Sequence, residues 1–437
     1  AKGCQVSGSD IRHNKITETL EEQGANIIIG HFAENVGDAD VVIYSSAISA
    51  DNPELTTARE KKIPVLQRAE LLAELMENYE SVTVVGAHGK TTTSSMIANL
   101  LHSANLNPTT AVGGIVNQFA TNAFLGKGEY FVAELDESDG SFLKFRPKYS
   151  VITNIDKEHL DHYQSWEHIL KAYKEFMTQT DPKGVLIAFG DDENIQSLLK
   201  MYNGKYMTYG FSHNNTIYAD VVRTQGLKTT FACYRLNQLM GEVELNLPGK
   251  HNVANALAAV AVGIILGLKF EDIQKGIRSF QGVRRRFQVL GESNGVTVID
   301  DYAHHPTEIR NVLLAAQNIK RNSESQRRLV TVFQPHRYSR LQLLMQEFVQ
   351  SLMLSDELIL TDVYAASEDP IDGVDAQALE KNIRNHSPQP VKYIPKDKLV
   401  EYLTDFTQEG DIVLTLGAGD ITQVSHSFKA HLEKIII

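Results

Sequence analysis

The sequence predicts an α/β protein of three domains. Its 437 residues are too many for one hydrophobic core, so two to four domains are expected. Short apolar runs rich in β-branched residues, typical of buried strands, alternate with stretches whose apolar residues recur at helical spacing. Polar residues gather directly after many of these runs, as at the carboxyl ends of parallel strands that bind a ligand. We place the domains at 1–79, 80–287 and 288–437.

Composition excludes several classes of protein. With 42% hydrophobic and 22% charged residues the chain is an ordinary globular one, and its net charge of -12 argues against general binding to nucleic acid. The two cysteines, Cys4 and Cys233, are too few for a disulfide framework or a zinc site. No apolar run is long enough to span a bilayer, and the first residues do not resemble a secretory signal. We therefore expect a cytoplasmic protein.

The first domain has hydroxyl-rich segments at two predicted strand ends. Gln5–Asp10 is expected to be a strand end that runs into a loop, followed by a helix through Leu20 and strands at Ala25–Ile29 and Asp40–Tyr44. Ligand contacts and plain loops or caps explain the serines equally well. No Gly-x-Gly-x-x-Gly motif precedes them, so a complete dinucleotide fingerprint is absent. The candidate serines are Ser7, Ser9, Ser45 and Ser46.

Val82–Leu101, VTVVGAHGKTTTSSMIANLL, has the layout of a phosphate-binding loop. A β-branched apolar run leads into a glycine-rich turn, and helical periodicity follows. Backbone N–H groups of such a turn can surround phosphate oxygens, and the helix N-terminus adds partial positive charge. We expect Lys90 to reach the terminal phosphates and the Thr91 hydroxyl to bind magnesium. The loop residues are Gly86, Ala87, His88, Gly89, Lys90, Thr91 and Thr92.

The spacing of the two glycines departs from the general motif. That motif has four residues between its glycines, whereas this chain has Ala87 and His88. A Gly-Lys-Thr tripeptide also occurs by chance in surface turns. The strand before it and the helix after it favour nucleotide binding over a plain turn.

Acids and histidines follow the next two predicted strands. Glu134 lies within the apolar run Tyr130–Leu135, and a carboxylate beside a phosphate loop is how nucleotide enzymes hold magnesium. A solvated acidic turn explains Asp139 well but Glu134 less well. The strand Tyr149–Thr153 leads into a segment that contains His159 and three acids. Because histidine is more often structural and magnesium prefers oxygen, a metal site and a structural role stay equally open there.

Amides and arginines lie near the end of the second domain. Asn252 and Asn255 are three residues apart near the start of a predicted helix, so they share a face. They either cap the helix or read a purine edge. Residues 284–286 are three arginines, which form either a solvated face or a clamp on phosphate in a closed state.

Polar residues follow every predicted strand of the third domain, which predicts a ligand site on the carboxyl edge of its sheet. Asp301 and His304 come after the first strand, and His336 comes after the second. Residues 320–328 are expected to be a loop. The predicted strands are Val296–Ile299, Leu329–Phe333, Glu357–Thr361 and Ile412–Leu416.

Six motifs in this order resemble those of the Mur ligases, the ATP-dependent amide-forming enzymes of peptidoglycan precursor synthesis. They are GAHGKTT at 86–92, TN…H…D…Y at 153–163, G…HN…N at 249–255, DYAHHPTE at 301–308, QPHRYSR at 334–340 and GAGD at 417–420. The short glycine spacing is the form that this family uses. The resemblance implies a Rossmann-like N-terminal domain for the UDP-sugar, a central P-loop ATP-binding α/β domain and a Rossmann-like C-terminal domain for the amino acid. The last two motifs look like those of members that join L-alanine to UDP-N-acetylmuramate.

The chemistry of that family suits these residue types. ATP converts an unreactive carboxylate into an acyl phosphate, the amine attacks it, and phosphate leaves from a tetrahedral intermediate. Catalysis is then mainly positioning and charge neutralisation. By resemblance, Lys90 neutralises the terminal phosphates, Thr91 and Glu134 hold one magnesium, and His159 holds a second, which favours the metal site over the structural role. No lysine matches the carbamylated lysine of several relatives, so that role would be unfilled or taken by an acid.

The resemblance also implies how the substrates are held. Arg286 would meet the γ-phosphate and Asp301 the ribose, so that closure of the third domain completes the ATP site and excludes water. His304 is expected to help near the amino acid. The adenine would be framed by His251, Asn252 and Asn255, and the carboxylate of the amino acid would be received by His336, Arg337 and Arg340.

One departure concerns the UDP-sugar. Family members begin with a strand and a Gly-rich loop that helps to hold uridine diphosphate, and this sequence starts after that point. The resemblance therefore implies a first domain that lacks these elements and part of its UDP contacts. The serines named above are the candidate contacts that this sequence contains.

Competing functions predict nucleotide binding as well. One is the recycling ligase that joins a tripeptide to the same sugar nucleotide, and others are a non-catalytic nucleotide-binding protein and a P-loop NTPase switch. The close spacing of His336, Arg337 and Arg340 favours the alanine enzyme, because a small amino acid needs its carboxylate held closely. The expected cofactors are ATP and Mg²⁺, with Mn²⁺ as an alternative. The expected partners are UDP-N-acetylmuramate and L-alanine, without nucleic acid or membrane, in a monomer or weak dimer.

Overall fold

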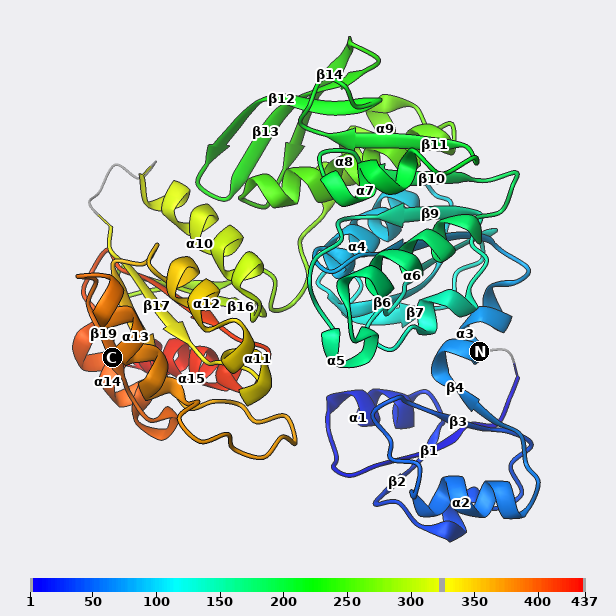
Figure 1. Ribbon diagram of the computed structural model, residues 1–437, viewed down its shortest axis with the longest axis horizontal. Helices are drawn as coiled ribbons and strands as arrows, with labels where there is room; N and C mark the ends of the chain where they lie inside the picture. The colour runs from blue at the N-terminus through cyan, green and yellow to red at the C-terminus, as the bar shows by residue number, and fades with distance from the viewer. Residues whose placement is uncertain (1–2, 322–326, 435–437) are drawn as a thin grey trace.

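The computed structural model describes residues 3–321 and 327–434, except the side chains of Lys15, Leu160 and Asp161. Figure 1 shows three bodies: a small N-terminal one in blue, a large central one from cyan to green, and a C-terminal one from yellow to red. The α/β class and the three-domain organisation predicted from the sequence are confirmed. Among the described residues, no helix has the length and apolarity that crossing a membrane requires.

The N-terminal body contains two separate two-stranded parallel sheets. Two of its helices begin where an asparagine side chain, Asn14 or Asn52, accepts hydrogen bonds from the first backbone N–H groups. The expected loop at Ser7–Asp10 is wrong, because these residues form strand β1 and pair with β2. The elements are β1 (Ser7–Asp10), α1 (Lys15–Glu22), β2 (Asn26–Ile29), η1 (Ala33–Val36), β3 (Val42–Tyr44), α2 (Pro53–Glu60), β4 (Val65–Gln67) and α3 (Arg68–Met76).

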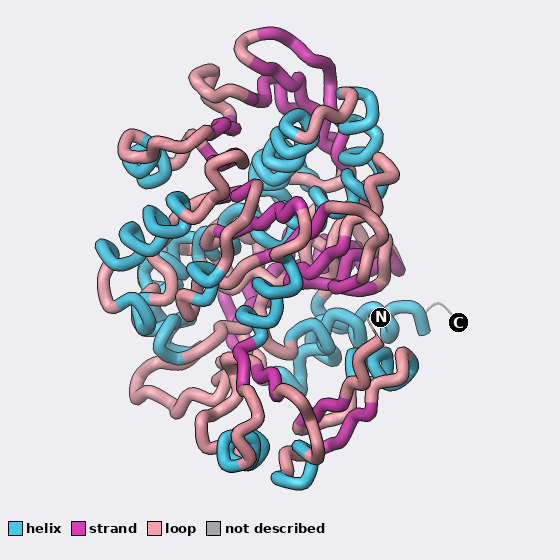
Figure 2. The backbone as a smooth tube through the Cα atoms, turned by 90° about the vertical axis from the view of Figure 1, so that its right-hand side faces the viewer, coloured by secondary structure: helices cyan, strands magenta, loops and turns pink. Residues whose placement is uncertain are grey.

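The central body is built on one ten-stranded sheet with the order β14-β13-β12-β11-β10-β9-β5-β8-β6-β7. Strand β5, which precedes the glycine-rich loop, lies between β8 and β9 and is parallel to both. The strands are β5 (Glu80–Val85), β6 (Thr109–Val116), β7 (Thr121–Phe124), β8 (Tyr130–Glu134), β9 (Tyr149–Ile152), β10 (Val185–Phe189), β11 (Tyr206–Gly210), β12 (Ile217–Gln225), β13 (Lys228–Arg235) and β14 (Gln238–Leu245). The last three form one end of the molecule, opposite the N-terminal sheets, in both views (Figures 1 and 2).

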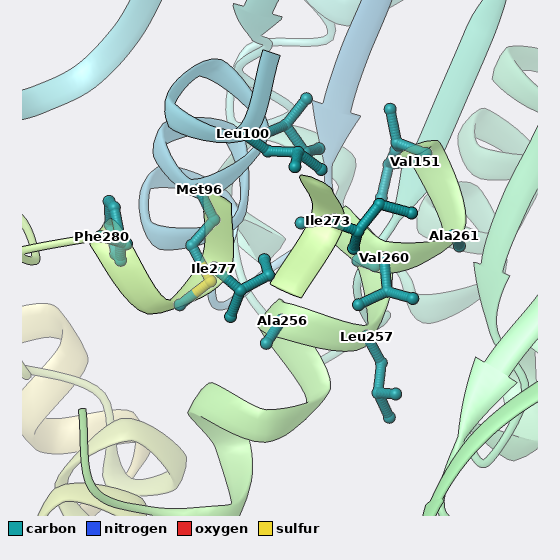
Figure 3. Packing of buried hydrophobic residues seen from close by; sticks show 14 of the residues in the cluster. Met96, Leu100, Val151, Ala256, Leu257, Val260, Ala261, Ile273, Ile277 and Phe280 are labelled. Carbon is teal, nitrogen blue, oxygen red and sulfur yellow. The ribbon is translucent and has the colours of Figure 1, made fainter. Parts of the chain in front are cut away.

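Two hydrophobic layers cover the faces of this sheet. On one side α4, α8 and α9 pack together through Leu100, Ala256 and Ile277 (Figure 3). On the other side α6 packs Tyr173 and Phe176 against the strands. Because β8, β5 and β9 are neighbouring parallel strands, the loops that follow them meet on one edge of the sheet. The helices are α4 (Lys90–Ser103), η2 (Ser141–Lys144), α5 (Leu160–Tyr163), α6 (Trp166–Thr178), α7 (Glu193–Leu199), α8 (Lys250–Ile265) and α9 (Phe270–Ser279).

The C-terminal body has a six-stranded sheet with the order β15-β16-β20-β17-β18-β19, in which β15 alone is antiparallel to its neighbour. Its strands are β15 (Gln288–Ser293), β16 (Val296–Asp301), β17 (Leu329–Phe333), β18 (Glu357–Leu360), β19 (Val391–Tyr393) and β20 (Ile412–Leu416). The helices are α10 (Pro306–Arg321), α11 (Tyr338–Leu343), α12 (Met345–Leu352), α13 (Ala376–His386), η3 (Lys396–Lys398), α14 (Leu399–Phe406) and α15 (Ile421–Lys434).

The predicted third-domain strands are confirmed within two residues, and two of them have the predicted bounds. The predicted loop at 320–328 is wrong at its start, since α10 continues through Arg321, and residues 322–326 lie outside the described part of the chain. Helix α10 also contacts α8 of the central body. Helix α10 therefore lies where the C-terminal body meets the central body (Figure 1).

Candidate active site

The glycine-rich loop joins β5 to α4, and its two glycines are required by close contacts. A Cβ on Gly86 would lie 2.1 Å from Thr153 Oγ1, and one on Gly89 would lie 2.7 Å from Asn255 Oδ1. Both residues have positive φ, +133° and +80°, which other residues rarely adopt. Asn154 accepts a hydrogen bond from the backbone N–H of His88 at 2.9 Å, which fixes the loop. Asn154 thus takes the N–H groups of Ala87 and His88, and the N–H groups of the first turn of the fourteen-residue helix α4 are the ones suited to an anion.

Lys90 lies at the centre of this loop. Its Nζ donates to the carbonyl oxygens of Gly86 at 2.6 Å and Ala87 at 3.2 Å, and to Glu137 Oε1 at 2.8 Å. Glu137 is almost completely buried, and burial raises its pKa to about 7 although the nearby Lys90 opposes the shift. Glu137 is not among the residues predicted from the sequence. It lies in the acidic turn after β8, whereas Glu134 is the last residue of that strand, and no spacing pattern indicates it.

Thr91 and Glu134 are in contact, as predicted for a shared cation. The Thr91 hydroxyl donates to Glu134 Oε1 at 2.9 Å, and the other carboxylate oxygen accepts the backbone N–H of Gly113 at 2.6 Å. Strand β8 ends at Glu134, so the carboxylate reaches the loop directly. The two oxygen ligands are therefore prepositioned beside the phosphate loop.

His159 lies between two buried acids. Its Nε2 is 3.6 Å from Glu137 Oε1 and 3.8 Å from Glu158 Oε2. One ligand atom from each of the three residues lies within 4.8 Å of the others, and Glu137 Oε2 has no hydrogen-bond partner among the described residues. The side chain of Asp161, in the same predicted segment, lies outside the described side chains. This group can hold a divalent cation through two oxygens and one nitrogen.

A second group of charged residues connects the loop to the C-terminal body. His88 Nε2 hydrogen-bonds Asp156 Oδ2 at 2.8 Å, and His88 Nδ1 lies 3.6 Å from Glu308 Oε1. The Thr307 hydroxyl donates to the same Asp156 oxygen at 3.0 Å. Burial by itself lowers the pKa of His88, but the contacts with Asp156 and Glu308 outweigh it and raise that pKa to about 10. His88 is therefore a buried cation shared by two domains.

A cavity of about 580 Å³ lies between the central and C-terminal bodies. Its walls come from the glycine-rich loop, the ends of β9, β10 and β11, the start of α8 and the first turns of the C-terminal body. The predicted cofactor-binding residues on its walls are His88, Gly89, Thr92, His251, Asn252, Asn255, Arg286 and Asp301. A cavity of this size accommodates a nucleotide-sized ligand.

The two asparagines on the cavity wall are not helix caps, because the cap residue of α8 is Gly249. Asn252 Nδ2 donates to the carbonyl of Pro248 at 2.8 Å, and Asn255 Nδ2 donates to Asn252 Oδ1 at 3.3 Å. The side chain of Asn255 also accepts from Thr93 at 3.1 Å. Next to them, burial lowers the pKa of His251 to about 4, so this imidazole is neutral. The arrangement gives the cavity wall uncharged polar groups that suit the edge of a base.

The three consecutive arginines have different surroundings. Arg284 is exposed, whereas Arg285 donates to the carbonyl oxygens of Gly417 and Gly419 at 2.6 and 3.0 Å. Arg286 faces the cavity, with its guanidinium 5.0 Å from the Tyr302 ring and 3.8 Å from Glu308. The solvated-face interpretation thus fits Arg284, and the phosphate clamp fits Arg286.

Asp301 hydrogen-bonds the segment that joins the central and C-terminal bodies, and it also lines the cavity. Its carboxylate accepts the backbone N–H groups of Phe287 at 2.6 Å and Ala303 at 2.7 Å. Burial raises its pKa to about 6. A carboxylate with one hydrogen bond on each oxygen retains acceptor capacity for a hydroxyl group.

The predicted amino-acid-binding residues of the C-terminal body form two groups. Arg340 Nη1 lies 3.2 Å from His336 Nδ1, and the rings of His336 and His304 are 5.5 Å apart. Burial lowers the pKa of His304 to about 3 and that of His336 to about 4, so both rings are neutral. Arg337, by contrast, is exposed and lies 3.9 Å from Glu368. The structure therefore places His304, His336 and Arg340 together and Arg337 apart.

The four serines of the N-terminal body are spread over two sheets. Ser9 Oγ donates to Glu54 Oε2 at 2.8 Å and lies 2.9 Å from His31 Nδ1. Ser45 Oγ accepts the backbone N–H of Ala47 at 3.3 Å, as a turn residue does. Ser7 and Ser46 are exposed, and β1 and β3 belong to different sheets.

Three family models match the chain: the Mur ligase family, catalytic domain, over residues 1–80; the Mur ligase middle domain over 84–263; and the Mur ligase, glutamate ligase domain, over 285–419. A UDP-N-acetylmuramate–L-alanine ligase from Geotalea daltonii is 46% identical over 433 residues, which cover 99% of this chain and 93% of that protein.

Solved structures show the same architecture. A UDP-N-acetylmuramate–alanine ligase from Thermotoga maritima is similar with a TM-score of 0.83 and 31% identity, over 98% of this chain and 93% of that one. A murein peptide ligase from Psychrobacter arcticus has a TM-score of 0.68 and 22% identity, over 98% of this chain and 93% of that one, and so shows the fold alone.

Proposed function

The chain belongs to the Mur ligase family, and from this membership we propose that it joins L-alanine to UDP-N-acetylmuramate, with ATP, in the synthesis of peptidoglycan precursors. The observation that carries the proposal is that Glu158 is close enough to both Lys90 of the phosphate loop and Arg340 of the other domain for each to lower its pKa against the effect of burial. Arg340 is close enough to influence the pKa of Glu158, which lies beside His159. This proximity supports a phosphate site and an amino acid site next to each other.

ATP activates the sugar carboxylate in the first step. A carboxylate oxygen attacks the γ-phosphorus, the bond from that phosphorus to the β-γ bridging oxygen breaks, and ADP leaves. Lys90 and the N–H groups of the glycine-rich loop stabilise charge on the phosphates, and Arg286 approaches from the far side of the cavity. His251, Asn252 and Asn255, which line the cavity, would hold the adenine, and Asp301 would accept hydrogen bonds from the ribose hydroxyl groups.

The amine of L-alanine attacks the acyl phosphate in the second step. A C–N bond forms, the amine loses a proton, and the C–O bond to phosphate breaks from the tetrahedral intermediate. Arg340 holds the amino acid carboxylate, while the neutral rings of His304 and His336 bound a small space around it. The bidentate ion pair between the guanidinium and the carboxylate of the amino acid fixes its amine in position.

The side chains at the edge fit two magnesium ions. Thr91 and Glu134 supply oxygens for one, and Glu137, Glu158 and His159 would hold the other, so that these acids fill the role that relatives give to a carbamylated lysine. The buried, unpartnered Glu137 Oε2 supports this assignment. When bound, such ions neutralise phosphate charge and align the reacting oxygens.

The assay is phosphate release with ATP, Mg²⁺, UDP-N-acetylmuramate and L-alanine, with each component omitted in turn. Release should require all four and should be lost in Lys90→Ala. A tripeptide that supported faster release than L-alanine would move the assignment to the recycling ligase. ATP binding without release, with either amine, would leave only a nucleotide-binding protein.

A further inference from the structure

Three potential metal ligands from different segments converge between the loop and the C-terminal body. They are His88 from the loop after β5, Asp156 from the loop after β9, and His305 directly before α10. Their ligand atoms all lie within 4.8 Å of one another. The group lies outside both oxygen-rich magnesium assignments made above.

The distances within this group are near those of a metal site. His88 Nε2 is 2.8 Å from Asp156 Oδ2, and His305 Nδ1 is 4.0 Å from the same oxygen. Ligands 2.0–2.1 Å from a tetrahedral ion lie roughly 3.3 Å apart. A shift of about 1 Å in these side chains would therefore allow all three to bind one ion.

The other ring nitrogen of each histidine lies near a carboxylate. His88 Nδ1 lies 3.6 Å from Glu308 Oε1, and His305 Nε2 lies 3.9 Å from Glu158 Oε1. Both nitrogens are buried and have no hydrogen-bond partner among the described residues. Metal-binding histidines usually direct the second nitrogen at a carboxylate, which orients the ring and increases its basicity. The surroundings of both rings therefore resemble the outer layer of a metal centre.

We propose that His88, Asp156 and His305 form a zinc-binding site that bridges the phosphate loop and the C-terminal domain. Two imidazoles and one carboxylate suit Zn²⁺, whereas Mg²⁺ prefers oxygen ligands. Three protein ligands leave a fourth position for water or a phosphate oxygen. Zinc replaces the hydrogen bond between His88 and Asp156 and the 3.4 Å hydrogen bond that the Thr307 backbone N–H donates to His305 Nδ1, and the N–H proton of His88 is released to solvent.

Zinc bound at this site restrains the movement of the central and C-terminal domains relative to each other. His305 and Thr307 belong to the C-terminal body, and His88 and Asp156 line the cavity. An ion held by both domains opposes their separation, which exchange of nucleotide and product requires. Zinc is therefore expected to inhibit turnover while raising the melting temperature of the free protein.

The test measures zinc binding by the full chain without nucleotide or substrate, by calorimetry in excess Mg²⁺ and by the visible absorption of Co²⁺ as a probe. A Cys4→Ser background removes the exposed thiol. The parent chain, in which His88, Asp156 and His305 are intact, should bind one zinc ion. His305→Asn and Asp156→Asn should each reduce the affinity for zinc at least about tenfold. His213→Asn, an exposed histidine 3.7 Å from Asp220, is the matched control and should bind as before.

His159→Asn separates this site from the neighbouring group of Glu137, Glu158 and His159. Loss of zinc binding in His159→Asn with retention in His305→Asn would overturn the proposal, as would equal binding by His305→Asn and the parent chain. Thermal melts with a chelator identify any variant that fails to fold, and Asp156→Asn then provides the second measurement. The ligase activity plays no part in these readouts, so failure here leaves the proposed function intact.

Discussion

Glu137 Oε1 accepts a hydrogen bond from Lys90 Nζ at 2.8 Å, so the loop lysine is held by a buried acid before any phosphate is present. The same carboxylate oxygen lies 3.6 Å from His159 Nε2. One acid thus connects the residue expected to meet the terminal phosphates with the residue expected to hold a cation.

Glu137→Gln is predicted to separate binding from catalysis. The amide keeps the volume but removes the charge that competes with phosphate for Lys90, so ATP should bind at least as tightly. Lys90 is less firmly oriented and the proposed second cation loses a charged ligand, so kcat should fall at least about tenfold, since loss of one charge-assisted hydrogen bond alone amounts to about 1.5 kcal/mol. Binding is measured by calorimetry and kcat by phosphate release. Lys90→Ala should instead weaken ATP binding, and an equal loss of affinity in both variants would contradict this role.

Gly113→Ala is predicted to disrupt cation binding at Glu134. The new Cβ would lie 2.6–2.8 Å from the carboxylate atoms of Glu134, which must move away from Thr91. The Mg²⁺ concentration for half-maximal activity should rise about tenfold or more, because one of two protein ligands is displaced. A magnesium titration of phosphate release measures it. Gly8→Ala, where the nearest atom is 3.6 Å from the added carbon, is the control and should leave the magnesium requirement unchanged.

Thr307→Val is predicted to weaken domain closure. It removes the 3.0 Å hydrogen bond from the C-terminal body to Asp156 without changing side-chain volume. A hydrogen bond to a charged group contributes about 1.5–3 kcal/mol, and partial exposure of Thr307 reduces this, so KM for ATP should rise about threefold to tenfold. Steady-state kinetics measure KM, and small-angle scattering measures the compaction on adding ATP. Thr178→Val, an exposed threonine bonded within its own helix, should change neither.

The stability of the fold is predicted to fall below pH 6.5, partly through His251. Burial lowers its folded pKa to about 4 from an ordinary value of 6.5, so the unfolded chain binds more protons between these values. Stability is therefore full above pH 6.5 and is lost as pH falls toward 4, by about 2 kcal/mol between pH 7 and pH 5 for this one group. Urea unfolding at both pH values should show a smaller difference in His251→Gln. An unchanged difference would assign the acid sensitivity to other groups.

The sequence predicted the local chemistry better than the partners of each side chain. Leu329–Phe333 and Ile412–Leu416 were predicted with their observed bounds, because fully buried parallel strands are continuous apolar runs. Likewise the loop at 86–92 follows from glycine, lysine and threonine at fixed spacing.

The errors and omissions have physical causes. Ser7–Asp10 contains no apolar residue, so its pairing with β2 is set by tertiary structure and not by pattern. Glu137 was not selected because burial of one acid in an acidic turn depends on Lys90, 47 residues earlier. The separation of Arg337 from Arg340 depends on the position of Glu368 in another loop.

Arg340 and Arg337 are predicted to differ in importance although they are three residues apart. Arg340 contacts His336 beside the site, whereas Arg337 is exposed and near Glu368. Arg340→Lys keeps the charge but loses the planar two-point contact with a carboxylate, so KM for L-alanine should rise about tenfold or more while KM for ATP changes little. Arg337→Lys is the matched control and should change KM for L-alanine less than about threefold, as expected for an exposed pair. Both constants come from initial rates of phosphate release. A larger effect at Arg337 would mean that this side chain leaves Glu368 and turns inward when substrates bind, so that the exposed arginine is the one that receives the carboxylate.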